Sequence, residues 1–309
     1  MVLLCGIPSE SPLAMVAAQL TRLGVPHVFF NQRHVARTDM WFTVSRGHVT
    51  GRLNLDGRTY RLEDFRGVYT RLMDDRALPE MRDEPEDSEK SRHSHALHDT
   101  LMQWCEVTPA RVVNRTAPMG SNSSKPYQAQ LIRKHGFSIP ETLITNDPEL
   151  VRQFLSRHQQ LIYKSISGIR SIVETLDESA LARLGHIRWC PTQFQEYIPG
   201  KNLRVHTIDS RVFATAVVSN VTDYRYAHLQ KGGETELSAT ELSEQLVQRC
   251  LRLSQGLGLS FAGIDLKVTP DERVYCLEVN PSPAFSYYES NTGQPIAEAV
   301  ARFLSGHWV

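Results

Sequence analysis

The chain has 309 residues, of which 41% are hydrophobic and 22% charged, and its 34 basic residues balance its 34 acidic ones. This length predicts two or three lobes of a soluble globular protein. Because the net charge is zero, no global field attracts nucleic acid or acidic lipid, and neither partner is expected. The N-terminus lacks a signal peptide, no apolar run is long enough to span a membrane, and five scattered cysteines argue against disulfides and structural zinc. Together these features favour a cytoplasmic protein.

The N-terminal part begins with a β-α-β pattern. Short apolar runs predict strands at 2–7, 27–30, 50–55, 59–62, 68–71 and 112–114. Apolar residues at helical spacing separate the first two strands, which predicts a small parallel sheet. Asp56-Gly57 separates the third and fourth strands and predicts a tight hairpin.

A charged segment at 80–92 is expected to be a solvated loop that leads into a helix. This helix carries His93, His95 and His98. Their spacing fits neither a helical pair of zinc ligands nor a zinc finger, so an exposed helix start is favoured over a metal site.

The rest of the chain divides into a central and a C-terminal part, which gives the predicted lobes 1–120, 121–198 and 199–309. Helices are predicted to open at Lys125-Pro126 and at Asp147-Pro148, where proline occupies the first turn. Strands are predicted at 138–144, 161–164, 171–175, 192–198, 202–208 and 211–218. Two further helices are predicted over 242–257 and 296–304.

The stretch from 261 to 285 carries the clearest chemical pattern. Two runs rich in β-branched and aromatic residues flank a Thr-Pro-Asp-Glu turn, which predicts a hairpin. In a hairpin closed near Asp271, Asp265 and Glu278 lie opposite each other. Alternation places Glu278 on the same face as Cys276 and Asn280.

Two carboxylates and an amide oxygen in otherwise apolar strands require a partner, and this ligand set suits magnesium held against phosphates. The prolines of Pro281-Ser282-Pro283 end the strand beside it. Acids that simply face water are the alternative reading of the hairpin.

Three other features carry weaker signals. The polar, basic loop at 163–171 can cover phosphates or be an ordinary turn. A strand that ends at Pro199-Gly200 can present backbone groups to a purine or simply end. Arg204 lies between apolar neighbours and requires an anion, either a structural carboxylate or a ligand.

The ordered set of these motifs resembles the ATP-grasp ligase superfamily over about residues 110–305. Within it, the chain looks most like the ribosomal-protein glutamate ligase branch, and closer still to the synthetases that cross-link ribosomal peptides of the microviridin (graspetide) type. Segments 124–126, 140–146 and 164–173 carry that closer resemblance. The resemblance implies an α/β (α+β) fold with an N-terminal parallel-sheet lobe, a central α+β lobe and a C-terminal antiparallel-sheet lobe.

The resemblance also implies roles for single residues. Arg204 and Lys164 are the implied catalytic residues. The residues implied to contact ATP are Lys125, Lys164, Ser167, Gln195, Glu196, Tyr197, Ile198, Asn202 and Arg204. Those implied to hold two magnesium ions are Asp265, Glu278 and Asn280. Many relatives carry an acid at the position of Asn202, which lowers the expectation for that one contact.

The implied reaction joins a carboxylate to an amine or hydroxyl through an acyl-phosphate, with ADP as product. The main hypothesis is cross-linking of side chains in a precursor peptide by a homodimer. A ligase for free amino acids or a protein tail is the second hypothesis, and a non-catalytic ATP-binding protein is the third. Candidate substrate contacts, each with a plain surface charge as its alternative, are Arg71, Asp74, Arg170, Asp223 and Arg225.

Overall fold

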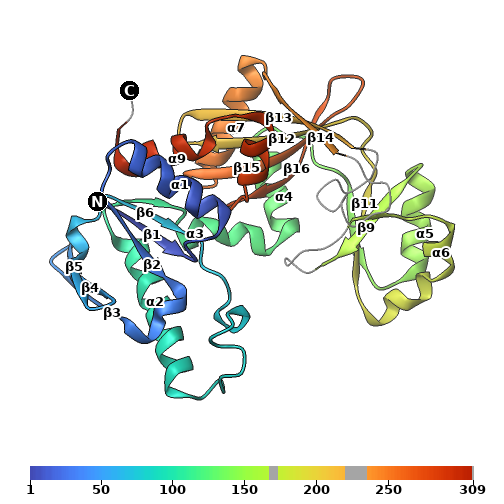
Figure 1. Cartoon of the computed structure of the whole chain (residues 1–309). Helices are drawn as coiled ribbons and strands as arrows, with labels where there is room; N and C mark the ends of the chain where they lie inside the picture. The colour runs from blue at the N-terminus through green and yellow to red at the C-terminus, as the bar shows by residue number, and fades with distance from the viewer. Residues whose placement is uncertain (167–172, 220–234, 308–309) are drawn as a thin grey trace.

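The computed structural model describes residues 1–166, 173–219 and 235–307, which form four sheets arranged in three lobes (Figure 1). The parallel N-terminal sheet lies beside the antiparallel C-terminal sheet, whereas the central sheet stands apart at the right of the view. This arrangement is the mixed α/β fold that the sequence predicts. None of the helices in these ranges combines the length and hydropathy needed to cross a bilayer.

The N-terminal sheet is fully parallel, as the β-α-β start predicts, and its strand order is β2-β1-β6-β7. Because side chains alternate along β1, Val2 and Leu4 pack in the core on the α1 side, while Leu3 and Cys5 pack on the α2 side. The elements are β1 (Val2–Gly6), α1 (Ser11–Arg22), β2 (His27–Asn31), β6 (Gly67–Thr70), α2 (Glu89–Val107) and β7 (Arg111–Val113).

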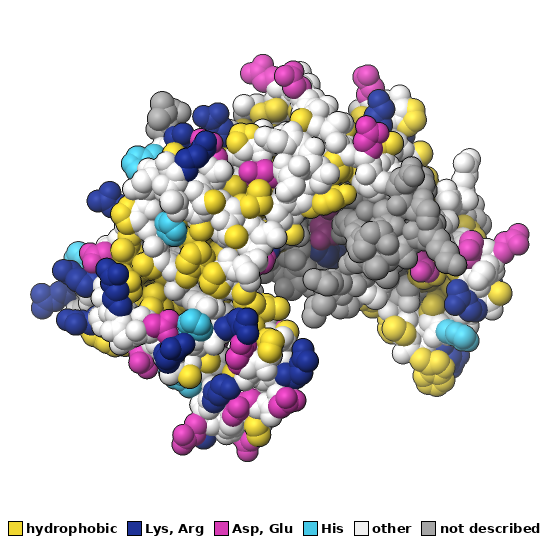
Figure 2. Space-filling view, in the orientation of Figure 1, with side chains coloured by type: hydrophobic (Ala, Val, Ile, Leu, Met, Phe, Trp, Pro, Cys, Tyr) yellow, Lys and Arg dark blue, Asp and Glu magenta, His cyan; other side chains and the backbone are white. Residues whose placement is uncertain are grey.

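A separate antiparallel sheet contains β3 (Thr38–Ser45), β4 (His48–Leu55) and β5 (Arg58–Arg61). The predicted turn at Asp56-Gly57 is confirmed, with both residues at positive φ (50° and 87°). Strand β3 was not predicted. Its exposed face carries the large apolar side chain of Trp41, which interrupts the apolar–polar alternation that marks a strand. Although the chain has no net charge, Figure 2 shows basic side chains gathered over this sheet, and within residues 38–61 these are arginines.

The central sheet is antiparallel, with strand order β10-β9-β11-β8. Its elements are β8 (Thr142–Thr145), α5 (Pro148–Arg157), β9 (Leu161–Ser165), β10 (Glu174–Thr175), α6 (Glu178–Ala182) and β11 (Thr192–Glu196). The predicted start of α5 is confirmed, since the Asp147 carboxylate accepts a hydrogen bond from the Glu149 amide at 2.8 Å. The strand predicted from residue 138 begins only at Thr142. Pro140 has no amide hydrogen to extend the ladder, and Ser138 pairs with Tyr275 instead.

The C-terminal sheet has five antiparallel strands in the order β14-β13-β12-β15-β16. Its core includes Ile132 of α4 and Cys250 of α7, which pack against β15 and β16. The elements are α4 (Lys125–Lys134), β12 (Lys201–Ile208), β13 (Arg211–Ser219), β14 (Thr235–Thr240), α7 (Glu244–Gly256), β15 (Phe261–Val268) and β16 (Val274–Asn280). The predicted hairpin at 261–285 is therefore formed by the last two strands.

Three shorter or terminal helices complete the fold: α3 (Thr116–Met119), α8 (Ser286–Thr292) and α9 (Ile296–Ser305). The last of these packs beside α1 and shares one hydrophobic core with Leu4, Phe261 and Phe285 (Figure 1). The end of the chain thus joins the first lobe to the last. The lobe boundaries at 120 and 198 stay a prediction.

We predict that Gly67→Ala destabilises the protein by about 1–3 kcal/mol, the usual cost of overpacking a close contact. Gly67 opens β6 directly against the backbone of Leu304 in α9, and a Cβ there would overlap the Leu304 carbonyl. Urea unfolding measures the effect. Gly120→Ala is the matched control, because no atom lies within 4 Å of its added Cβ. Equal unfolding free energies for both variants would contradict this packing.

A second prediction concerns His206, which is fully buried in β12 against Tyr288. Burial, followed by the charge of Arg204, lowers the pKa of His206 well below its ordinary value of 6.5. Below about pH 6.5 the unfolded chain binds a proton at His206, whereas the folded chain does not. The unfolding free energy should therefore fall by up to about 1.4 kcal/mol per pH unit as the pH decreases.

Urea unfolding between pH 7.5 and 5.5 tests this, with His206→Gln expected to remove that part of the pH dependence. The control is His48→Gln, on the exposed face of β4. An unchanged slope in His206→Gln would show that the buried ring is not the group that titrates.

Candidate nucleotide and metal site

The β15–β16 hairpin places Asp265 and Glu278 directly opposite each other, as the sequence predicts. Beyond this pair the register shifts, so that Leu266 pairs with Cys276 and Leu277 is an extra residue. The prediction that Cys276 shares a face with Glu278 is therefore wrong. The bulge turns Cys276 into the core and leaves Leu277 and Glu278 lining a cleft.

Asp265 is paired with Arg204, its cross-strand neighbour on β12. The guanidinium donates from Nη1 to Oδ1 at 2.8 Å, and the arginine side chain is only 6% exposed. Gly263 makes room for it, because a Cβ there would overlap the guanidinium. The ring of Tyr288 lies 5.5 Å from the arginine carbon Cζ. The buried arginine thus has the anionic partner that the sequence demanded.

Glu278 is paired with Lys125, the first residue of α4. The ammonium lies 2.8 Å from Oε1 of Glu278 and 2.7 Å from Oδ1 of Asn122. Both side chains of the pair are less than one-fifth exposed. Each carboxylate of the hairpin is thus held by a cation from a different element of the fold.

The strand end after Glu278 is fixed by groups from the N-terminal part of the chain. The Asn280 amide oxygen accepts from the Ser282 amide at 2.9 Å. Buried Asn114 donates to the carbonyls of Pro281 and Phe261. Its oxygen also accepts from the amide of Phe261 at 3.1 Å. A single side chain therefore clamps both strands of the hairpin from outside the sheet.

Arg71 supports the same loop and lies largely buried. Its guanidinium pairs with Glu10 and donates to Oγ of Ser282 at 3.2 Å and to the carbonyl of Pro283 at 3.3 Å. The predicted substrate contact at Arg71 stays a prediction. The contacts that the structure gives this side chain are structural.

A cleft between the central and C-terminal sheets collects most of the predicted site residues. The predicted residues that line it are Lys164, Gln195, Glu196, Tyr197, Ile198, Asn202, Asp265 and Glu278. Lys125, Arg204 and Asn280 are not among the lining residues and lie behind its acidic end. The remaining walls are largely apolar, which suits a flat ring held between two lobes.

The strand end at Glu196 is organised by hydrogen bonds from neighbouring segments. The Glu196 amide donates to the carbonyl of Glu141 at 3.0 Å, and its carboxylate accepts from the Glu141 amide at 2.8 Å. The Tyr197 amide donates to the carbonyl of Gln160 at 3.0 Å. This segment leaves β11 in a fixed conformation and leads directly into buried Ile198.

Sequence reasoning assigned no role to Lys267 or Leu277, which also line the cleft. The Lys267 ammonium lies 4.9 Å from the ring centroid of Tyr197, and burial lowers the pKa of this lysine. Lys267 also pairs with Asn202 in the β12–β15 register. Strand alternation puts Lys267, two residues after Asp265, on the same face, and this was a usable signal. No signal in the sequence predicted the bulge that places Leu277 in the wall of the cleft.

Several predicted residues lie elsewhere. Ser167, Arg170, Asp223 and Arg225 fall outside the described residues. Asp74 is exposed in the N-terminal lobe, where its carboxylate accepts from Arg76 at 2.8 Å, and it does not line the cleft.

The donor set at the acidic end fits a magnesium-bound nucleotide. Among the described residues no three His, Cys, Asp or Glu side chains form a metal cluster, so two carboxylates and the second lone pair of the Asn280 oxygen are the available ligands. Magnesium typically takes one or two carboxylates and completes its shell with phosphates and water. Lys125 and Arg204 pair with these two carboxylates and so place positive charge at the same end.

Comparison with known proteins agrees with this geometry. A model of the RimK-like ATP-grasp domain matches residues 122–304. A probable alpha-L-glutamate ligase of Rhodopirellula baltica is 27% identical over 62% of this chain and 49% of its own length. Beta-citrylglutamate synthase B of Danio rerio is 25% identical over 66% of this chain and 53% of its own. The chain spans about half the length of the curated relatives it matches.

Solved structures extend the likeness to the whole chain. A RiPP-associated ATP-grasp ligase of Chryseobacterium gregarium, in complex with ADP and a leader and core peptide, superposes with a TM-score of 0.82. That pair is 22% identical, and the match covers 100% of this chain and 97% of the other. The macrocyclase MdnC of Microcystis aeruginosa, bound with its precursor peptide, gives a TM-score of 0.81 at 23% identity over the full length of both chains.

A third structure is that of the ATP-grasp ligase PsnB, complexed with a variant of its minimal precursor, Mg and ADP. It is 25% identical to this chain and superposes with a TM-score of 0.77. The match covers 98% of this chain and 97% of PsnB. These likenesses confirm the predicted fold. The family model covers more than half of the sequence, including every described residue of the acidic cleft. The chain therefore belongs to the RimK-like ATP-grasp family.

Proposed function

We propose that the protein is an ATP-dependent ligase that joins side-chain carboxylates of a precursor peptide to amines or hydroxyls of the same peptide. The observation that carries this proposal is the acidic end of the cleft, where Asp265 and Glu278 face each other and each is held by a cation. A non-catalytic nucleotide-binding protein would have no need to keep this arrangement. The full-length likeness to peptide-bound ligases supports a peptide as substrate.

In this proposal the cleft binds ATP between its two sheets. Glu196, Tyr197 and Ile198 present the backbone to the adenine, while Asn202 and Lys267 lie at the ribose side. Lys125 and Lys164 meet the phosphates, and Ser167 and Gln195 complete the predicted set. Asp265, Glu278 and Asn280 hold magnesium, two ions by family resemblance, which supplies charge neutralisation for phosphoryl transfer.

The chemistry has two steps. A carboxylate oxygen of the substrate attacks the γ-phosphorus of ATP, the bond from that phosphorus to the bridging oxygen breaks, and ADP leaves. An amine or hydroxyl then attacks the acyl carbon, phosphate leaves, and the proton of the nucleophile passes to phosphate or solvent. The task of the protein is to place and neutralise charge, so no protein nucleophile is required.

Arg204 is the residue best placed to stabilise the transferring group. It is buried directly behind the acidic end, and its guanidinium is held between Asp265 and Tyr288. Because the position is fixed before substrate binds, little reorganisation is needed when negative charge develops.

A ligase that adds an amino acid to a free amino acid or a protein tail is the second candidate. The names of the curated relatives, glutamate ligase and citrylglutamate synthase, favour it. A homodimeric assembly and a cytoplasmic location belong to the proposal through family resemblance and composition alone.

Mass spectrometry separates the two candidates. A short peptide encoded beside the gene, rich in Thr, Ser, Lys, Asp and Glu, should lose one water per cross-link on incubation with ATP and magnesium. ADP release with free amino acids alone, and no loss of water from peptides, would replace the first candidate by the second. Failure of both assays would favour the non-catalytic reading.

We predict that Asp265→Asn lowers the rate of ATP-dependent ligation by about 100-fold or more, since it removes the negative charge that would hold the metal and that pairs with Arg204. Asp271→Asn is the matched control. Asp271 lies in the turn of the same hairpin, is exposed, and pairs with Arg273 at 2.7 Å. ADP release under saturating ATP measures both variants. A similar loss in both would point to the hairpin's stability rather than to the acidic cleft.

A further inference from the structure

A second cavity, of about 220 Å³, lies in the N-terminal lobe away from the nucleotide cleft. It opens where β2 and β6 end, between the segments that follow them and helix α2. Parallel sheets typically bind ligands at this edge. The lining residues are Phe30, Gln32, Val35, Leu72, Met73, Asp74, Asp75, Ser94, His95, Leu97 and His98.

The walls of this cavity are apolar and rigid. Phe30, Val35 and Leu97 are buried in the core beneath it. Gln32 holds the segment after β6 with two hydrogen bonds, donating to the Met73 carbonyl at 2.6 Å and accepting from the Met73 amide at 3.1 Å. The cavity is therefore preformed. Its volume lies below the roughly 300–1,000 Å³ of pockets for whole small molecules and suits a single side chain.

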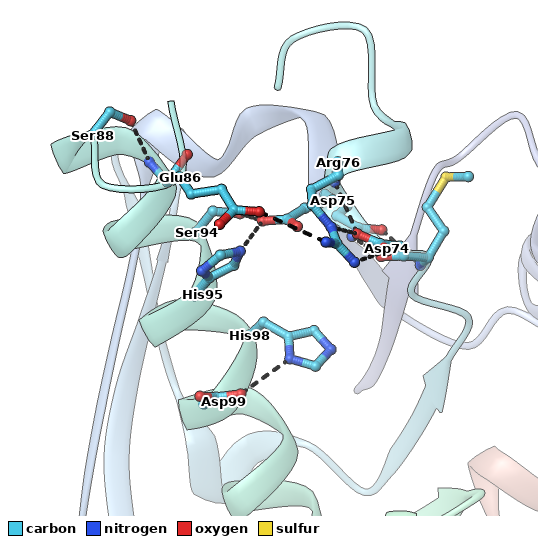
Figure 3. A network of polar contacts seen from close by, with 12 residues as sticks. Asp74, Asp75, Arg76, Glu86, Ser88, Ser94, His95, His98 and Asp99 are labelled. Carbon is cyan, nitrogen blue, oxygen red and sulfur yellow. Dashed lines mark hydrogen bonds and ion pairs between the residues drawn. The ribbon is translucent and has the colours of Figure 1, made fainter. Parts of the chain in front are cut away.

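The polar side of the cavity is acidic (Figure 3). Asp75 is only 13% exposed, and its Oδ2 accepts from Oγ of Ser94 at 2.7 Å and lies 3.3 Å from Nε2 of His95. Both of these contacts use Oδ2, which leaves Oδ1 open toward a ligand among the described residues. Asp74 beside it is paired with Arg76. The charged residues that line the cavity are two aspartates and two histidines, without a lysine or arginine.

We propose that this cavity binds a lysine or arginine side chain of the peptide substrate. The aliphatic stem would pack on Phe30, Val35 and Leu72, while the cationic head reaches Asp75, which matches how such side chains bury their stems. Charge complementarity selects this occupant, because an acidic side chain would meet two carboxylates. The inference rests on the proposed peptide ligase function and adds a recognition element to it.

The position of the cavity gives this contact a purpose. Arg71, at the start of the same segment, bonds to Ser282 and Pro283 at the metal end of the hairpin. Three residues lie between it and Asp75, which makes four steps along the chain and a reach of at most about 14 Å. A basic residue in the cavity would thus fix which neighbouring carboxylate of the peptide arrives at the acidic cleft.

Binding can be tested without any turnover. The protein, labelled with carbon-13 at its methionine methyl groups, is titrated with Nα-acetyl-L-arginine amide and Nα-acetyl-L-lysine amide. We expect a saturable shift of the Met73 resonance, identified with Met73→Leu, at a dissociation constant on the order of 1–10 mM. Nα-acetyl-L-norleucine amide, with a stem but no charge, should bind at least about tenfold more weakly. Equal binding of all three probes would overturn the proposal.

Substitutions test which carboxylate of the cavity binds the cationic probe. Asp75→Asn should weaken arginine-probe binding at least about tenfold, while Asp87→Asn, exposed before the start of α2 and outside the cavity, should leave it unchanged. Asp74→Asn keeps the test open if Asp75→Asn does not fold, because Asp74 is exposed. It should weaken binding several-fold by leaving Arg76 unpaired at the rim. Unchanged binding in the folded Asp75 or Asp74 variant would refute the assignment.

The outcome is separable from that of the proposed function. If no peptide is cross-linked but the arginine probe still binds at Met73, the ligase proposal fails and the basic-side-chain site stands. If a peptide is cross-linked with the same KM after all of its Lys and Arg residues are replaced by norleucine, the site is wrong and the ligase proposal stands.

Discussion

The pairing of Asp265 and Glu278, the two carboxylates at the acidic end of the cleft, with one largely buried cation each is the constraint on which the rest of this structure depends. Asp265 and Arg204 face each other across two strands, and Glu278 meets Lys125 from a helix. Four charges removed from water in this way are costly unless their geometry is held. The fold supplies that rigidity through Gly263, which leaves space for the guanidinium, and through the C-terminal sheet core beneath.

This geometry is maintained by parts of the chain that contribute nothing to the cleft itself. Asn114 clamps both strands of the hairpin, and Arg71 holds the loop beyond Asn280. Helix α9 connects the N-terminal and C-terminal parts, because it packs against α1 in a hydrophobic core that contains residues from both ends of the chain. The N-terminal lobe therefore acts on the nucleotide site through a fixed contact, while the central lobe supplies the opposite wall of the cleft.

Much of this arrangement was predictable because it follows from local rules. Alternation and turn chemistry were enough to place Asp265 opposite Glu278 and to close the Asp56-Gly57 hairpin. The demand of buried Arg204 for an anion was also readable, although its partner was not. Long-range contacts had no local signal, since Asn114 reaches residues nearly 150 positions away. Alternation places Lys267 on the face of Asp265, but its contact with the Tyr197 ring joins two segments 70 residues apart and has no local signal.

The extra residue in β16 adds an apolar side chain to the cleft wall without displacing the carboxylate that follows it. Before Leu277 the odd and even positions of the strand have one assignment to core and cleft, and after it they have the other. Removing Leu277 would leave a regular strand, because Cys276 and Glu278 already pair with the consecutive residues Leu266 and Asp265. The acids would stay where they are, and the cleft would lose one apolar side chain beside Glu278. The bulge therefore adjusts the shape of the wall next to the carboxylates and leaves their alignment to the flanking register.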